Sequence, residues 1–244
     1  MLQRQTFEVQ LDNFRNEAYL AARYMYAEMA IQHAASKSSK LLNRLNRTPT
    51  FWMTCGAALQ SSAYISIARI FDVKSDYNVN ALLKSMGDNL SIFQKDALES
   101  RKRIGTTNDP EWLEDYLLKA YYPTIKDVER LQKKVGEYRV IYDKAVKPVR
   151  NKYLAHREKQ DSNEVANLYA GGKLKELWRI CSFLLQLHSL LQELLMNGRK
   201  PVMRAIRYSP KSIFDSKTQN SNPHESIVGE VKCLMQFIET QGNY

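Results

Sequence analysis

The sequence predicts an all-α protein, a helical bundle of three to four long helices with short helices between them. Two observations lead to this prediction. Only nine glycines and seven prolines occur among 244 residues, which is few for a chain that must make the many turns of a β-sandwich or barrel. Apolar residues also recur at steps of three and four, the spacing of one face of an α-helix, and no stretch shows the alternation of a strand. The composition, 44% hydrophobic and 25% charged, is that of a globular protein.

The N-terminal third contains two long helical patterns. In the first, Thr6 is the expected N-cap of one apolar stripe: Phe7, Leu11, Phe14, Ala18, Ala21 and Met25. A short helix over residues 39–45 follows and ends before Pro49. The second long helix covers about residues 51–71 and has no charged residue between Phe51 and Ala68. Its threonine, glutamine and serine side chains are costly in lipid, so we expect a buried helix at the centre of the fold rather than a membrane span.

The middle of the chain contains shorter patterns and a third long helix. Short helices are expected over residues 81–86 and 90–101. The long helix that follows carries one apolar stripe: Ile125, Val128, Leu131, Val135, Tyr138, Tyr142 and Ala145. Pro148 interrupts this stripe, so the chain must kink or begin a new helix there.

The last long helix begins after Gly171–Gly172 and ends at Asn197–Gly198, a usual helix C-terminus. This pattern divides the chain into a helical domain over residues 1–198, a basic connector over 199–223 and a C-terminal helix over 224–244.

The net charge of +10 attracts polyanions, above all nucleic acid. Basic residues concentrate in two windows. Residues 144–159 hold six of them against one acid: Lys144, Lys147, Arg150, Lys152, Arg157 and Lys159. Residues 199–211 hold five and no acid: Arg199, Lys200, Arg204, Arg207 and Lys211. A solvated helix face and a solvated loop are the alternative explanation of these windows.

Several kinds of chemistry have no support in the sequence. The three cysteines are scattered and form no C-x-x-C pair, which argues against a disulfide framework and a zinc site. His188 lies on the apolar stripe of the last long helix and is expected to be a hydrogen-bonded core residue rather than a ligand. We expect no metal, no cofactor and no membrane partner. Free thiols, and the lack of an apolar run behind Met1, favour a cytoplasmic location.

One segment is a candidate for chemistry, the one from Arg150 to His156. An arginine followed by a histidine at this distance is weak evidence, because about one such pair is expected by chance in a chain of this composition. The surroundings strengthen it. Asn151 directly follows the arginine, Ala155 precedes the histidine, and the segment is basic and lies just after Pro148.

The string Arg-Asn-Lys-Tyr-Leu-Ala-His over residues 150–156 resembles the signature of HEPN domains (higher eukaryotes and prokaryotes nucleotide-binding). A second stretch, Ala68–Asp72 followed by Asn80–Leu83, resembles the abortive-infection U (AbiU-like) branch of that superfamily. In that branch a long helix ends in Arg-x-Phe-Asp before a short Leu-Leu helix. The order of the helices also agrees, and the resemblance covers roughly residues 5–198.

The resemblance implies a metal-independent endoribonuclease that acts as a homodimer, as a toxin or in phage defence. RNA is the implied substrate, and an antitoxin or a nucleotidyltransferase is a candidate partner. The residue types suit this chemistry, since His156 can act as base or acid near neutral pH and Arg150 offers a fork matched to phosphate oxygens. Asn151 can donate to the phosphate or hold the arginine. Further contacts to nucleic acid are expected from basic residues of the same segment: Lys147, Lys152 and Arg157.

The spacing of the pair adds a constraint. Six residues along a helix give about 240° of rotation and about 9 Å of rise, so Arg150 and His156 do not share one face. Two copies that meet across a two-fold axis would bring both pairs into one cleft. Pro148 can begin a fresh helix turn and so place Arg150 near an N-terminus, where amides favour an anion.

Two other classes of function stay open. The chain can be a non-catalytic HEPN module that binds RNA, nucleotide or a protein partner through its basic cleft. It can also be a structural or regulatory dimer, in which His156 caps or bonds within the bundle and Arg150 pairs with an acid on a neighbouring helix.

Overall fold

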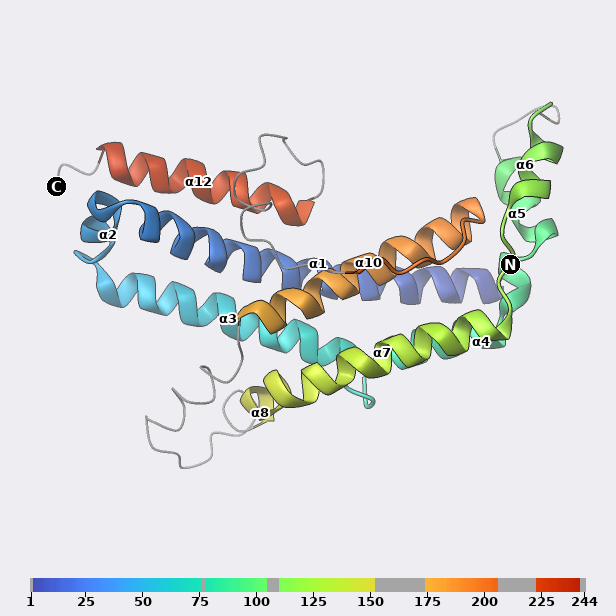
Figure 1. Cartoon of the computed structure of the whole chain (residues 1–244), viewed down its shortest axis with the longest axis horizontal. Coiled ribbons are helices and arrows are strands. Elements are labelled where there is room, and N and C mark those ends of the chain that lie inside the picture. Colours follow the sequence, from blue (N-terminus) through green and yellow to red (C-terminus); the bar gives the residue numbers. More distant parts are fainter. Residues whose placement is uncertain (1, 76–77, 105–109, 152–173, 206–222, 242–244) are drawn as a thin grey trace.

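A computed structural model describes residues 2–75, 78–104, 110–151, 174–205 and 223–241. Within these ranges the chain is helical and contains no strand, which confirms the predicted all-α class. Long helices run side by side along the molecule, and two short ones stand across one end (Figure 1). The predicted homodimer stays a prediction.

The first helix, α1 (Leu2–Lys37), lies at the centre of the fold and packs against α3, α10 and α12. Its predicted apolar stripe is buried throughout: Phe7, Leu11, Phe14, Ala18, Ala21 and Met25 are at most 3% exposed. The predicted start at Thr6 is wrong, because the helix already runs at Leu2.

Ser38 caps the next helix, α2 (Ser39–Leu45), by accepting a hydrogen bond from the Leu41 N–H. The uncharged helix is α3 (Pro49–Phe71), and the prediction that it is a central buried helix is correct only for its second half. Its first half lies on the surface, where Phe51 is 59% and Met53 is 74% exposed. α1 packs against α3, but the first half of α3 stays largely exposed, so the absence of charge in that half does not reflect burial.

Short helices follow: α4 (Val79–Asp88), η1 (Leu90–Phe93), α5 (Lys95–Lys102) and α6 (Leu113–Lys119). The predicted helix over residues 90–101 is split, because Gln94 takes an extended conformation between η1 and α5. α5 and α6 stand across the end of the bundle where α10 ends (Figure 1).

The third long helix is α7 (Ile125–Ala145), and a capping box of Thr124 and Asp127 fixes its start. Burial alone would raise the pKa of Asp127, but hydrogen bonds from Thr124 and Tyr121 outweigh it and lower this pKa. The predicted stripe is confirmed from Val128 to Ala145, whereas Ile125 is exposed.

α7 ends with Val146 as its C-cap, and a short helix α8 (Lys147–Val149) follows, with Pro148 in its first turn. Two backbone hydrogen bonds cross this junction, from the Val146 N–H to Tyr142 and from the Arg150 N–H to Val146. Pro148 lies in the first turn of a new helix, as predicted, but the Arg150 N–H donates to the Val146 carbonyl and is therefore not available to an anion. Arg150 and Asn151 continue the path as a π-helical turn.

The fourth long helix is α10 (Leu174–Asn197), whose Phe183 ring stacks on Tyr138 of α7 with 3.9 Å between centroids. It ends, as predicted, at Gly198, whose φ of +55° favours glycine. A Cβ at this position would also lie 2.8 Å from Leu98.

The last helix, α12 (Pro223–Gln241), packs against α1 and α2 (Figure 1). Arg44 of α2 donates to the Ile238 carbonyl, and Ser38 donates to Glu239. No helix among the described residues is long and apolar enough to cross a membrane.

His188 lies on the buried face of α10 and is 6% exposed. Its ring packs edge-on against Tyr19. Its burial is as predicted, but its Nε2 has no hydrogen-bond partner in the described part of the chain. Burial, and secondarily Arg15, lower the pKa of His188 from 6.5 to about 4, while Asp12 opposes the shift.

This burial predicts a loss of stability in acid. Below pH 6.5 the unfolded chain protonates His188, whereas the folded chain resists until pH 4, so the free energy of unfolding falls as pH falls through this window. The contribution at pH 4 is about 3 kcal/mol. Urea unfolding of the wild type and His188→Leu at several pH values measures it, because the variant lacks this component. Parallel pH profiles for the two proteins would contradict the prediction.

Candidate functional site

The candidate site begins at the end of α3, where Asp72 fixes a tight turn. The Asp72 N–H donates to Ala68 at 2.8 Å and closes the helix. Its carboxylate accepts from the Lys74 N–H at 3.1 Å, and its carbonyl accepts from the Ser75 N–H at 3.0 Å. The turn therefore holds one carboxylate oxygen locally and leaves the other, Oδ2, for a distant partner.

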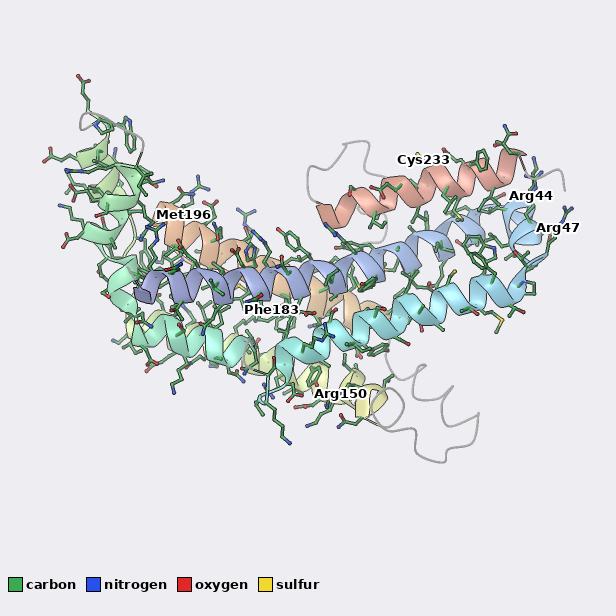
Figure 2. All side chains as sticks on the ribbon, turned by 180° about the vertical axis from the view of Figure 1, so that it is seen from behind. Arg44, Arg47, Arg150, Phe183, Met196 and Cys233 are labelled. Atoms are coloured by element: carbon green, nitrogen blue, oxygen red, sulfur yellow. The ribbon has the colours of Figure 1, made fainter. Side chains whose placement is uncertain are left out.

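That partner is Arg150. Its Nη2 lies 3.0 Å from Asp72 Oδ2, and its Nη1 donates to Asn151 Oδ1 at 2.9 Å. The arginine side chain is 38% exposed and the aspartate 25%, so the pair faces solvent on one side. These bonds use two of the five N–H donors of the guanidinium. Figure 2 shows Arg150 on the segment that follows α7, beside the end of α3.

Aromatic rings form the wall behind this pair. Phe71 stacks on Tyr142 with 4.9 Å between the ring centroids, and Arg139 donates to the Phe71 carbonyl at 2.8 Å. Burial raises the pKa of Tyr142; the charge of Asp72 adds to this shift and the charge of Arg150 opposes it. The end of α3 is thus fixed against α7 by apolar stacking, and the charged pair lies at its edge.

A hollow of about 260 Å³ opens beside the pair. Its lining comes from α3, the turn after it and Arg150: Ile65, Ala68, Arg69, Asp72, Lys74, Ser75 and Arg150. Three cations and one carboxylate give this lining an excess of positive charge, although Arg69 also pairs with Glu17 at 3.1 Å. The hollow is smaller than a drug-sized ligand pocket and suits a compact anionic group.

The structure describes only part of the predicted site. Arg150 and Asn151 lie together, and Lys147 lies one turn earlier, where its ammonium is 3.2 Å from Asp143. Lys147 does not line the hollow. Three predicted residues lie outside the described ranges: His156, Lys152 and Arg157.

The residues that line the hollow with Arg150 were not predicted as site residues. In the sequence, Asp72 belongs to the stretch that resembles the AbiU-like branch, but that pattern assigned no role to it. Arg69 belongs to the same stretch, as the arginine of Arg-x-Phe-Asp, but no role was assigned to it either. Lys74 carried no signal, because nothing in local sequence places it beside a residue near position 150. Within the described ranges, no group of three or more His, Cys, Asp or Glu residues could hold a metal ion.

The two segments that resemble HEPN proteins, Ala68–Asp72 and the start of Arg150–His156, therefore meet at one ion pair in an all-α bundle. A model of the AbiU2 family of HEPN domains matches residues 4–217, and the chain belongs to that family. Comparisons with curated proteins and with solved structures found no match.

The exposure of the Arg150–Asp72 pair predicts a small contribution to stability. A double-mutant cycle with Asp72→Ala and Arg150→Ala should give a coupling free energy of at most about 1 kcal/mol, because half-exposed ion pairs are screened by water. Urea unfolding of the four proteins measures it. A coupling of several kcal/mol would instead make the pair a main support of the fold.

Proposed function

We propose that this protein is a metal-independent endoribonuclease of HEPN type, acting as a toxin or phage-defence effector through a composite site built by two copies of the chain. The observation that carries the proposal is the position of Arg150, which Asp72 and Asn151 hold at the mouth of a cationic hollow. An arginine held by two acceptors, with further N–H donors left over, suits the binding of a phosphate.

The proposed reaction is attack of the ribose 2′-oxygen on the adjacent phosphorus, with departure of the 5′-oxygen of the next nucleotide. His156 takes the 2′-hydroxyl proton and, once protonated, supplies a proton to the leaving 5′-oxygen. Arg150 bonds the phosphate oxygens and stabilises the charge that develops on them. Asn151 and Asp72 are positioning residues, because each accepts a hydrogen bond from Arg150.

In this proposal, a second copy related by a two-fold axis supplies the histidine that acts with each arginine. The spacing of six residues between Arg150 and His156 does not favour one shared face, so in this proposal the histidine that serves one arginine comes from the partner. Two copies with a net charge of +10 each repel one another, and an interface between them needs surface without charge.

The exposed side of α3 supports such an interface. Thr54, Ala58, Ser61 and Ile65 recur at steps of four, three and four, which places them on one face of the helix. All are exposed or partly exposed, none is charged, and Ile65 also lines the hollow of Arg150. An isologous contact along this stripe would therefore lead directly to the proposed site.

Loss of either proposed catalytic side chain should abolish RNA cleavage. Arg150→Ala and His156→Ala should each lower the cleavage rate at least a hundredfold and remove growth arrest on expression, with the circular dichroism spectrum unchanged. Wild-type cleavage should survive EDTA. A His156→Ala protein that cleaves at the wild-type rate would contradict the catalytic assignment, and EDTA inhibition reversed by magnesium would contradict the metal-independent mechanism.

The interface can be tested apart from catalysis. Ala58→Glu adds a carboxylate to the uncharged stripe, and burying it against a partner should weaken the dimer at least tenfold. Leu234→Glu on α12 is the matched control, since Leu234 is 49% exposed and lies on another helix. Sedimentation equilibrium measures both dissociation constants. Equal constants for Ala58→Glu and the wild type would place the interface elsewhere.

The ion pair itself favours a second candidate function, a non-catalytic HEPN module that binds RNA, nucleotide or a protein partner. Arg150 already has a carboxylate partner, which is what a purely structural arginine would show. Under this alternative, growth and RNA stay intact on expression, and Arg150→Ala and His156→Ala behave as the wild type.

A further inference from the structure

A second hollow lies at the far end of the bundle from Arg150 and has no role in the proposed reaction. Its volume is about 800 Å³. It lies where α10 ends beside α5, α6 and the segment that leads into α7. Tyr121 precedes α7 and Arg150 follows it, so the two hollows are separated by the length of that helix, about 30 Å. Figure 1 shows α6 and α8 at opposite ends of α7.

Hydrogen bonds build the floor of this hollow. Tyr116 donates to the Asn197 carbonyl at 2.8 Å, and the Tyr121 N–H donates to the Gly198 carbonyl at 2.7 Å. Lys102 donates to Asn197 Oδ1 at 2.7 Å. The end of α10 is thereby fixed to both walls, so the side chains around it keep their relative positions.

Aromatic rings and lysines lie together in the lining of this hollow. Trp112 is 51% exposed and lies edge-on to Tyr116, with 5.7 Å between the ring centroids. Lys102 lies over the Tyr116 ring at 5.1 Å and Lys200 lies over the Tyr121 ring at 5.6 Å. The hollow therefore offers a base the half-exposed indole of Trp112 for stacking, and it offers the phosphates the two lysines that line it with Trp112.

The basic side chains at this hollow differ in whether a carboxylate already pairs with them. Lys119 pairs with Asp115 at 2.5 Å, and Arg199 pairs with Glu193 at 3.0 Å. Lys102 and Lys200 have no carboxylate partner in the contacts of the described residues. Arg199 and Lys200 also begin the second basic window of the sequence, which the site at Arg150 does not use.

We propose that this hollow is a second nucleic-acid site, in which a base of a single strand stacks on Trp112 while its phosphates contact Lys102 and Lys200. Stacking selects a single strand, because the bases of a duplex are already stacked on one another. Lysine contacts to phosphate are independent of sequence and depend on salt. The site binds whether or not the chain cleaves RNA.

The test uses the full chain and a fluorescein-labelled ten-nucleotide 2′-deoxy strand, which lacks the hydroxyl that cleavage would need. Fluorescence anisotropy measures its dissociation constant. Trp112→Ala should weaken binding about tenfold or more. Trp112→Phe should restore most of the affinity, because a phenyl ring also stacks. An abasic strand of the same length should bind the wild type and Trp112→Ala equally.

The lysines have a matched control. Lys102→Ala/Lys200→Ala should weaken binding and lower the slope of log affinity against log salt by about 1.4, since two phosphate contacts are lost. Lys126→Ala/Lys133→Ala removes the same charge from exposed positions of α7 and should leave both quantities near the wild type. Equal losses in the two double variants would show a general charge effect and overturn the proposal.

Two further outcomes would also overturn it: wild-type affinity in Trp112→Ala, or tighter binding of a duplex than of the single strand. The Arg150→Ala protein separates this proposal from the enzymatic one. It should keep the dependence of strand binding on Trp112 even though it does not cleave RNA. Loss of that dependence in Arg150→Ala would mean that Trp112 does not form a site independent of Arg150, and it would overturn the proposal.

Discussion

Asp72 and Arg150 are 78 positions apart in the chain, and the 3.0 Å contact between them joins the end of α3 to the turn that follows α8. Neither side chain could hold this geometry alone. The carboxylate is aimed because its other oxygen is bonded to the Lys74 N–H. The guanidinium reaches this carboxylate because the helical path continues past Pro148, where the Arg150 N–H donates to the Val146 carbonyl. The proposed site depends on this contact, since it decides where the remaining donors of Arg150 point.

The uncharged helix α3 has two different surroundings, and this explains its composition better than burial does. One side packs against α1, and the exposed side carries small or apolar residues that lead to the hollow of Arg150. In a chain with a net charge of +10, such a surface is where a second copy would meet the least repulsion. The same feature that suggested a core helix in the sequence thus supports the proposed interface.

Local pattern predicted the fold where one face of a helix is buried. The stripe of α7 from Val128 to Ala145 followed from spacing alone, because a long amphipathic helix leaves few choices of face. The start of α1 and the exposed half of α3 did not follow, since a helix end needs no visible cap and exposure depends on which neighbours are present. Arg150 and Asn151 were proposed as site residues from the sequence, whereas Arg69 and Lys74 become neighbours of Arg150 only through the packing of α3 against α7.

In the proposed enzyme, arginine and histidine act together across two chains, and mixing two inactive proteins distinguishes this arrangement from a site built by one chain. In a mixed dimer of Arg150→Ala and His156→Ala, one protomer supplies the histidine and the other supplies the arginine. One arginine–histidine pair across the two chains is then intact, whereas neither chain alone has both residues. If subunits exchange freely, half of the dimers are mixed, and cleavage should return to roughly a quarter of the wild-type rate. Two inactive proteins that stay inactive after proven exchange would contradict the composite site.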